Sequence, residues 1–272
     1  MKEKTQAQQL AEKLFYKPAY AADKDVDVRE KASAFAEGYK KYLDAAKTER
    51  EAAAESEKQL LAAGYQLFDP KKTYAAGDKI YFVQDNKAIV AATIGTRSFE
   101  DGFRLLIAHT DCPRLDLRPT PLYESDHLSY FKTHYYGGVR KYQWATIPLA
   151  IHGVFTRADG TTVNVCIGEE DSDPVFCITD LLPHLSAEQN DRKLPDGIRA
   201  EELNLLIGSE AVQDEEVKDA VKLNTMILLN EKYGITEKDF VRAEIEIVPA
   251  FKARDIGCLL YTSPSPRDGA TS

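Results

Sequence analysis

Hydrophobic positions recur at helical spacing through the first 70 residues. One apolar stripe consists of residues mostly three or four apart, namely Phe35, Tyr39, Tyr42, Leu43 and Ala46. A stripe of this period predicts an amphipathic helix. Thr48 followed by Glu51 matches a capping box, which predicts the start of a new helix. That helix should end at Gly64, which suits a left-handed cap, and Pro70 prevents any continuation.

From residue 79 the pattern changes to that of short strands. β-Branched and aromatic residues fill 79–83 and 88–94 on either side of Asp85-Asn86, which predicts a β-hairpin. The apolar run 103–108 is bounded by polar residues, as expected of a buried strand, and it ends in His109-Thr110-Asp111. This places the tripeptide at the carboxyl end of a strand, where open α/β sheets bind their ligands.

Residues 113–249 read as a second, mostly β unit. Pro113, Pro119 and Pro121 mark its beginning. Strands are predicted at 128–136, 147–156, 161–167, 203–207 and 241–248, with a hairpin around Asp159-Gly160. A helical stripe between 217 and 228 ends at Gly234. The chain is therefore predicted to be an α/β protein with two units.

Composition excludes several classes of protein. The chain has 272 residues, a net charge of −9 and 43% hydrophobic residues, which is typical of a soluble globular protein. It contains no apolar run of the ~20 residues that a membrane helix needs, and its beginning lacks the apolar region of a signal peptide. The acidic balance argues against nucleic acid as a partner. Four cysteines without a CxxC motif indicate reduced thiols in the cytoplasm.

His109 and Asp111 are the main candidates for chemistry. A neutral imidazole ligates metals, and a carboxylate two residues away can orient it. The spacing alone leaves open a histidine that is simply hydrogen-bonded. His134 is expected on a polar strand face, His184 on the surface, and His127 and His152 have no partner identifiable from the sequence.

Several segments together resemble the M18 family of metallo-aminopeptidases, the aspartyl aminopeptidases and their bacterial relatives. They occur in family order and comprise 35–41, 47–50, 109–111, 132–144, 179–185, 201–209 and 251–257. The resemblance implies a zinc-peptidase-type α/β catalytic domain interrupted by a β-rich dimerisation domain. Residues 1–112 would begin the catalytic domain, 113–248 would be the inserted domain, and the chain would return to the catalytic domain at 249–257.

The resemblance also implies a reaction. Two divalent metals, usually zinc, activate a bridging water that releases N-terminal residues, acidic ones among them, from peptides. His109 would ligate one metal and Asp111 would orient it, while His184 would reach across a homodimer to help bind substrate. Other divalent metals are compatible with such a site.

The last residues depart from the family pattern. A DNA string that resembles a sequencing-library transposase adaptor encodes Cys258 to Asp268 residue for residue, so 258–272 are interpreted as read-through. The family's bridging Asp, general-base Glu and remaining metal ligands follow its Arg-Asp-Ile-Gly segment, which here runs into that tail. The chain as written is therefore expected to be an inactive N-terminal fragment of an aminopeptidase. The alternative is a non-catalytic dimerisation or binding module.

Overall fold

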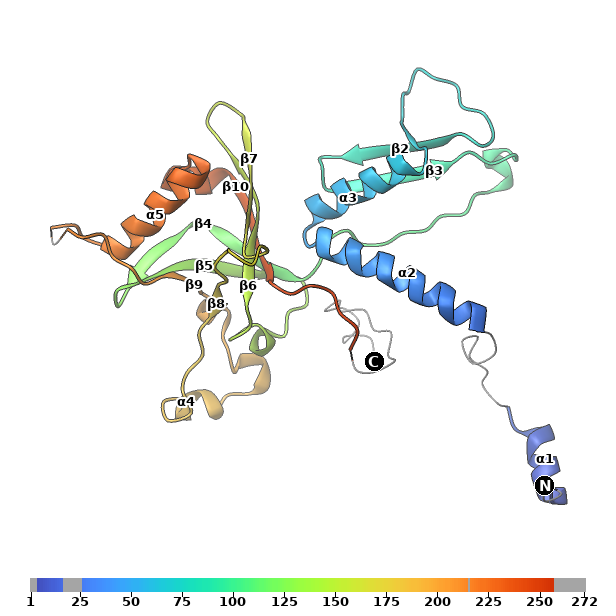
Figure 1. Cartoon of the computed structure of the whole chain (residues 1–272), viewed down its shortest axis with the longest axis horizontal. Helices are drawn as coiled ribbons and strands as arrows, with labels where there is room; N and C mark the ends of the chain where they lie inside the picture. The colour runs from blue at the N-terminus through green and yellow to red at the C-terminus, as the bar shows by residue number, and fades with distance from the viewer. Residues whose placement is uncertain (1–3, 17–25, 215, 257–272) are drawn as a thin grey trace.

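The computed structural model describes residues 4–16, 26–214 and 216–256, so the segment interpreted as adaptor-derived, 258–272, lies outside the described residues. These residues form two units side by side, each built on a β-sheet (Figure 1). The smaller sheet has strand order β1-β2-β3 and the larger β7-β6-β10-β4-β5-β9-β8. None of the described helices combines the length and apolarity needed to cross a bilayer.

Three helices precede the first sheet: α1 (Gln6–Leu14), α2 (Val26–Ala45) and α3 (Glu49–Ala62). The predicted capping box is confirmed, because the Thr48 hydroxyl accepts from the Glu51 N–H while the Glu51 side chain accepts from the Thr48 N–H. The chain then turns at Gly64, whose φ of 83° lies in the left-handed region. Local capping chemistry thus sets both ends of α3.

The apolar stripe on α2 belongs to a helix as predicted, but it is largely uncovered. Phe35 is 76% exposed and stacks on Tyr39 with ring centroids 6.5 Å apart. Tyr42 holds α2 against α3 through a 3.0 Å hydrogen bond between its hydroxyl and that of Ser56. Periodicity identifies a face that is suited to burial, whereas actual burial requires a second surface.

The smaller sheet consists of β1 (Gln66–Leu67), β2 (Lys79–Gln84) and β3 (Ala88–Thr93). The predicted hairpin is confirmed, and Asp85 and Asn86 take the positive φ values that its turn requires. Helix α3 lies across β2 and β3 (Figure 1), and the Tyr81 hydroxyl donates to Glu57 on that helix. Phe82 and Val90 remain exposed.

The buried strand predicted at 103–108 is wrong for this structure. The segment follows a short 3₁₀ helix, η2 (Phe99–Asp101), and has no regular secondary structure. Leu106 is 96% exposed. An apolar run becomes a buried strand only when neighbouring strands pair with it and other elements cover its faces, and the described strands do not do so.

The larger sheet is antiparallel throughout and comes from residues 114–249. Its strands are β4 (Arg114–Ser125), β5 (Leu128–Tyr136), β6 (Leu149–Thr156), β7 (Thr162–Ile167), β8 (Cys177–Ile178), β9 (Leu205–Gly208) and β10 (Ala243–Pro249). The last strand in sequence, β10, occupies an inner position between β6 and β4. Short helices η3 (Lys141–Gln143), α4 (Ala187–Asn190), η4 (Leu194–Asp196) and η5 (Ala200–Glu202) lie in the connections.

The main hydrophobic core belongs to this larger sheet. Phe240, from η6 (Glu237–Arg242), packs edge-on against Phe131 and Phe155, with ring centroids 5.4 and 5.1 Å away. Helix α5 (Ala220–Tyr233) is the predicted one, and it ends at Gly234 as expected. The backbone N–H groups of Val221 and Lys222 at its beginning donate to one Glu124 oxygen on β4.

Gly153 lies at a point where β6 passes close to the backbone of β10. Its φ is 137°, and a Cβ atom built there would collide with the carbonyl oxygen of Glu244. Only glycine fits this position without displacing the neighbouring backbone.

Candidate metal centre

His109 and Asp111 lie in the connection between β3 and β4 and contact each other directly. The His109 Nδ1 atom is 2.9 Å from Asp111 Oδ1, so an Nδ1–H donates to the carboxylate. This contact makes Nε2 the nitrogen through which a metal would bind. The His109 side chain is 65% exposed, whereas that of Asp111 is 27% exposed. The pair is the one that the sequence singled out.

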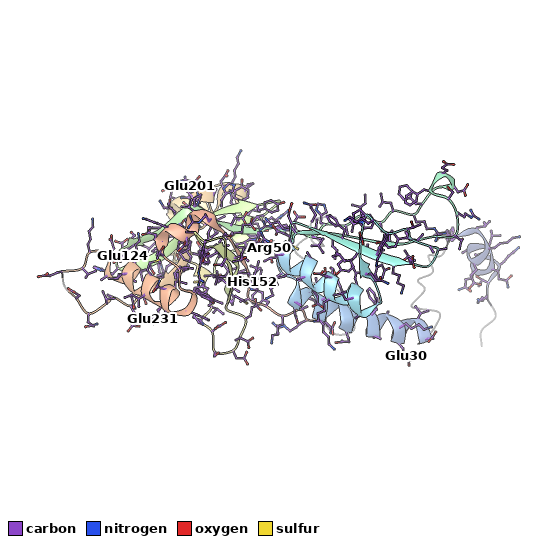
Figure 2. All side chains as sticks on the ribbon, turned by 90° about the horizontal axis from the view of Figure 1, so that it is seen from above. Glu30, Arg50, Glu124, His152, Glu201 and Glu231 are labelled. Carbon is purple, nitrogen blue, oxygen red and sulfur yellow. The ribbon has the colours of Figure 1, made fainter. Side chains whose placement is uncertain are left out.

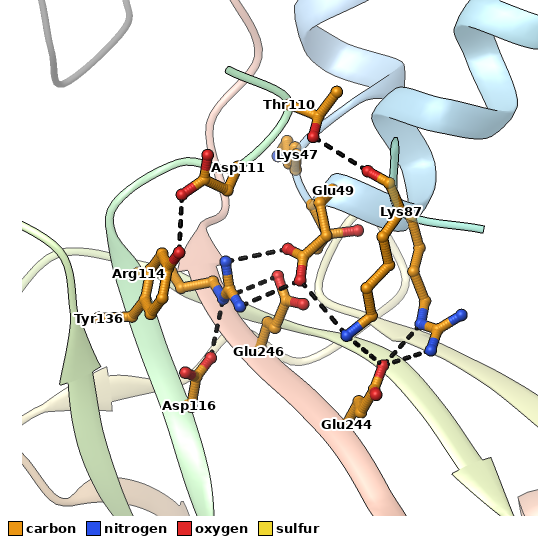
Figure 3. Close-up of polar contacts among 12 residues, drawn as sticks. Lys47, Glu49, Lys87, Thr110, Asp111, Arg114, Asp116, Tyr136, Glu244 and Glu246 are labelled. Carbon is orange, nitrogen blue, oxygen red and sulfur yellow. Dashed lines mark hydrogen bonds and ion pairs between the residues drawn. The ribbon is translucent and has the colours of Figure 1, made fainter. Parts of the chain in front are cut away.

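Two further contacts fasten this tripeptide to the two units. The Thr110 hydroxyl donates to the carbonyl oxygen of Lys87, at 3.0 Å, in the turn of the hairpin of the smaller sheet. The Tyr136 hydroxyl, at the end of β5, donates to Asp111 Oδ2 at 2.8 Å (Figure 3). Burial raises the pKa of Asp111, but the hydrogen bonds from His109 and Tyr136 outweigh it, so the pKa is lowered. The carboxylate is thus held ionised between two donors.

A buried ionic cluster adjoins Tyr136. Arg114, at the start of β4, pairs with Glu49 at 2.9 Å, Asp116 at 2.8 Å and Glu246 at 3.1 Å (Figure 3). Its guanidinium carbon lies 4.3 Å from the centroid of the Tyr136 ring. Burial raises the pKa of Glu246 to about 8, and the neighbouring charge of Glu49 adds to this. One buried cation is therefore surrounded by three carboxyl groups.

More ion pairs join the beginning of α3 to the larger sheet. Arg50 and Lys87 both pair with Glu244 on β10, at 2.5 and 3.0 Å. Lys47 donates to Glu169 at 2.5 Å and to the carbonyl oxygen of Pro249 at 3.1 Å. Figure 2 shows Arg50 and His152 at the junction of the two units. The segment 47–50, quoted above for its family resemblance, thus holds the two units together.

His152 is a buried member of this junction that sequence reasoning missed. Its Nδ1 lies 2.7 Å from Glu51 and its Nε2 lies 3.0 Å from Glu169, with the side chain only 4% exposed. Burial lowers the pKa of the imidazole, but the two carboxylates more than reverse this and raise it from 6.5 to about 9. His152 is therefore a charged bridge between two acidic side chains.

Cys166 lies on β7 opposite His152, with Sγ 3.9 Å from Nε2. Burial and the nearby Glu51 and Glu169 raise the pKa of the thiol to about 11. The pair therefore lacks the thiolate that a cysteine nucleophile requires.

The other histidines lie apart from this site. His134 is exposed on β5, as expected, and stacks on Tyr135, while His127 occupies the tight turn between β4 and β5. His184 is exposed in the loop before α4, and no hydrogen bond or ion pair among the described residues joins it to His109 or Asp111. The structure therefore brings His109 and Asp111 together and leaves His184 elsewhere.

His109 fits one position of a zinc site, because its imidazole is held by a carboxylate and has one nitrogen available. The described residues gather no group of three or more His, Cys, Asp or Glu side chains that could hold a metal ion. They therefore offer one candidate ligand, His109, and the carboxylate that supports it.

An α/β protein with a carboxylate-supported histidine at one end of an antiparallel sheet defines a candidate metalloenzyme. The sequence profile of the family described as "Aminopeptidase I zinc metalloprotease (M18)" matches residues 42–261. The chain belongs to this M18 family. The resemblance stated above is confirmed.

Relatives support this membership in sequence and in structure. A probable M18 family aminopeptidase 1 from Clostridium acetobutylicum is 47% identical over 246 residues, which cover 89% of this chain and 53% of the relative. The crystal structure of an M18 aminopeptidase from Thermotoga maritima matches with a TM-score of 0.79 at 43% identity, over 84% of this chain and 50% of that one. The crystal structure of aminopeptidase I from Clostridium acetobutylicum matches with a TM-score of 0.79 at 42% identity. The match covers 90% of this chain and 55% of that one. The chain thus spans about half the length of these relatives.

Proposed function

We propose that this chain is part of a zinc-dependent aminopeptidase, an enzyme that releases N-terminal residues, acidic ones among them, from peptides. The observation that carries the proposal is the contact between His109 Nδ1 and Asp111, found in a member of a zinc metalloprotease family. Two divalent ions would supply the activated water of such a reaction. His109 would bind one of them, and Asp111 would hold the imidazole in the tautomer that exposes Nε2.

The unit formed by residues 113–248, which contains the larger sheet except for its last residue, is proposed as the dimerisation domain of a homo-oligomer. His184 would reach the partner's active site from its exposed loop. Exposed leucines at 181, 182 and 185 flank it, and apolar side chains gathered on one loop favour a protein contact. No membrane or nucleic-acid partner is proposed, and the cytoplasm is the proposed location.

After β10 the chain is proposed to return to the catalytic domain. Two contacts support this assignment. The Ala253 N–H donates to Asp44 on α2 at 2.6 Å, and Asp255 pairs with Lys40 of the same helix at 3.1 Å. The path after Pro249 therefore leads back to the first unit.

We further propose that the 272-residue chain alone does not hydrolyse peptides. Its described residues offer one candidate ligand with its support, whereas a zinc site needs about four ligands in all. Purified chain incubated with Zn²⁺ and a peptide bearing N-terminal Asp should release no free amino acid above a buffer control. Measurable release that depends on the metal would contradict this proposal.

The aminopeptidase assignment is tested in a full-length M18 aminopeptidase that contains the described residues of this chain. His109→Ala should lower the zinc content of the purified enzyme, measured by mass spectrometry, and abolish release of the N-terminal residue. His134→Ala, which removes an exposed histidine outside the site, should leave both unchanged. An unaltered zinc content in His109→Ala would refute the ligand assignment. Dimerisation without hydrolysis by the unsubstituted enzyme would favour the non-catalytic module.

A further inference from the structure

The Thr110 hydroxyl joins the segment that carries His109 to the smaller sheet, but that contact does not orient the side chains of His109 and Asp111. Residues 102–113 contain no helix or strand, and the preceding apolar run is exposed. The Asp111 carboxylate is 27% exposed, so its side-chain rotamer depends on the groups bonded to it. A metal ligand, by contrast, must be held to within about 0.5 Å of its productive position. Some other part of the fold has to supply that order.

Tyr136 supplies the contact that can do so. Asp111 uses its two oxygens separately: Oδ1 accepts from His109 and Oδ2 accepts from the Tyr136 hydroxyl. With both oxygens engaged, the carboxylate cannot rotate without losing one bond. Tyr136 lies 25 residues away in the sequence, on a strand of the larger sheet.

The Tyr136 ring is itself fixed from behind. Tyr136 and Arg114 are directly opposite each other on β5 and β4, and the guanidinium lies 4.3 Å from the ring centroid. Arg114 is buried and is held by Glu49 from α3 and Glu246 from β10. The support of the histidine therefore runs continuously into the sheet and the junction between the two units (Figure 3).

We propose that Tyr136 is a positioning residue for the metal ligand His109, acting through the carboxylate of Asp111. The inference rests on the proposed function for the role of His109, and it adds that the larger sheet sets the tautomer and orientation of this ligand. The hydroxyl of Tyr136 is the essential group. The ring without it would keep the contact with Arg114 but would lose the hydrogen bond to Asp111.

The test reads the tautomer of His109 in the metal-free 272-residue chain by long-range ¹H–¹⁵N correlation NMR, at about pH 9, where an ordinary imidazole is neutral. The unsubstituted chain should show Nδ1–H as the dominant form of His109. In Tyr136→Phe, the ratio of Nδ1–H to Nε2–H should fall about tenfold or more, because the lost hydrogen bond to a charged group no longer holds the Asp111 carboxylate against Nδ1–H. Asp111→Asn marks the effect of removing the carboxylate itself.

Tyr135→Phe is the matched control, since it removes the same atom from the adjacent residue, whose ring stacks on His134. It should leave the His109 ratio unchanged. An unchanged ratio in Tyr136→Phe, or an equal fall in Tyr135→Phe, would overturn the proposal. If Tyr136→Phe failed to fold, the unsubstituted chain would decide. Its Tyr136 hydroxyl proton must exchange with water about tenfold more slowly than that of Tyr135, and equal exchange would overturn the proposal.

The readout uses neither metal nor peptide. It can therefore fail while the aminopeptidase assignment stands. The reverse outcome is also distinguishable. If Tyr136→Phe changes the tautomer ratio but His109→Ala leaves the zinc content of the full-length enzyme unaltered, the metal role of His109 is refuted while the positioning contact stands.

Discussion

Raising the pH from about 6 to about 10 should weaken the junction between the two units, because buried His152 loses its proton in that interval. The imidazole lies between Glu51 from α3 and Glu169, which follows β7. Lys47 also pairs with Glu169, and the pKa of the Cys166 thiol, about 11, keeps it protonated over most of the range. Deprotonation of His152 leaves the two carboxylates without their shared cation.

The size of the effect follows from the pKa of His152, which is about 9 in the folded protein against 6.5 for an ordinary imidazole. At about 1.4 kcal/mol for each tenfold change in proton affinity, the difference corresponds to about 3 kcal/mol. Because the folded pKa is the higher one, the stabilisation is complete below 6.5 and is lost as the pH rises through about 9. The raised pKa of Glu246, about 8, acts in the same direction over a more acidic interval.

The assay is urea unfolding, followed by far-UV circular dichroism at several pH values, for the unsubstituted chain and for His152→Gln. The free energy of unfolding of the unsubstituted chain should fall by about 3 kcal/mol more than that of the variant between the two ends of the range. His134→Gln, in which an exposed histidine of β5 is replaced, should follow the unsubstituted chain.

Parallel pH profiles for the unsubstituted chain and His152→Gln would refute this reasoning. They would mean that His152 is neutral in the folded protein, or that the junction opens without cost to the rest of the fold. A larger pH effect in His152→Gln than in the unsubstituted chain would reverse the sign of the argument and refute it equally.

Two further predictions concern the larger sheet. Phe240→Ala should lower the free energy of unfolding by about 3–5 kcal/mol, since it leaves a cavity between two aromatic rings. The same urea assay on Val241→Ala, an exposed neighbour, should show little change. Gly153→Ala should yield mostly insoluble protein, because the added methyl group collides with the Glu244 carbonyl oxygen. Gly160→Ala, at a turn with open space around it, should remain soluble. Thermal unfolding should show that its free energy of unfolding is lower by only about 1 kcal/mol. Soluble Gly153→Ala of unchanged stability would contradict the close approach of β6 and β10.

Features that depend on neighbouring residues were predictable from the sequence. The Thr48 capping box, the hairpin turn at Asp85-Asn86 and the helix end at Gly234 each need only a few consecutive residues to specify a conformation. His109 and Asp111 are two residues apart, so their contact also lies within reach of sequence reasoning. In each case the chemistry that sets the structure is local.

Features that depend on residues far apart in the sequence were not predictable from it. His152 meets Glu51 across 101 residues, and Tyr136 meets Asp111 across 25, with no spacing rule that connects them. The run 103–108 has the composition of a buried strand, but burial is a property of the surfaces around a segment. The capping-box pattern identified Glu51, but only as part of a helix cap. The local sequence gives no sign that the same carboxylate also contacts His152.

The inner place of β10 has a consequence for synthesis on the ribosome. The strands that flank it, β6 and β4, are made about 100 residues earlier, yet each leaves an edge open until β10 arrives. Until then the nascent chain holds β4 in one group of strands with β5, β9 and β8, and β6 in a hairpin with β7, so the sheet is completed only after residue 249 has left the exit tunnel. Such late, long-range pairing slows folding and lengthens the period in which molecular chaperones must shield the growing chain.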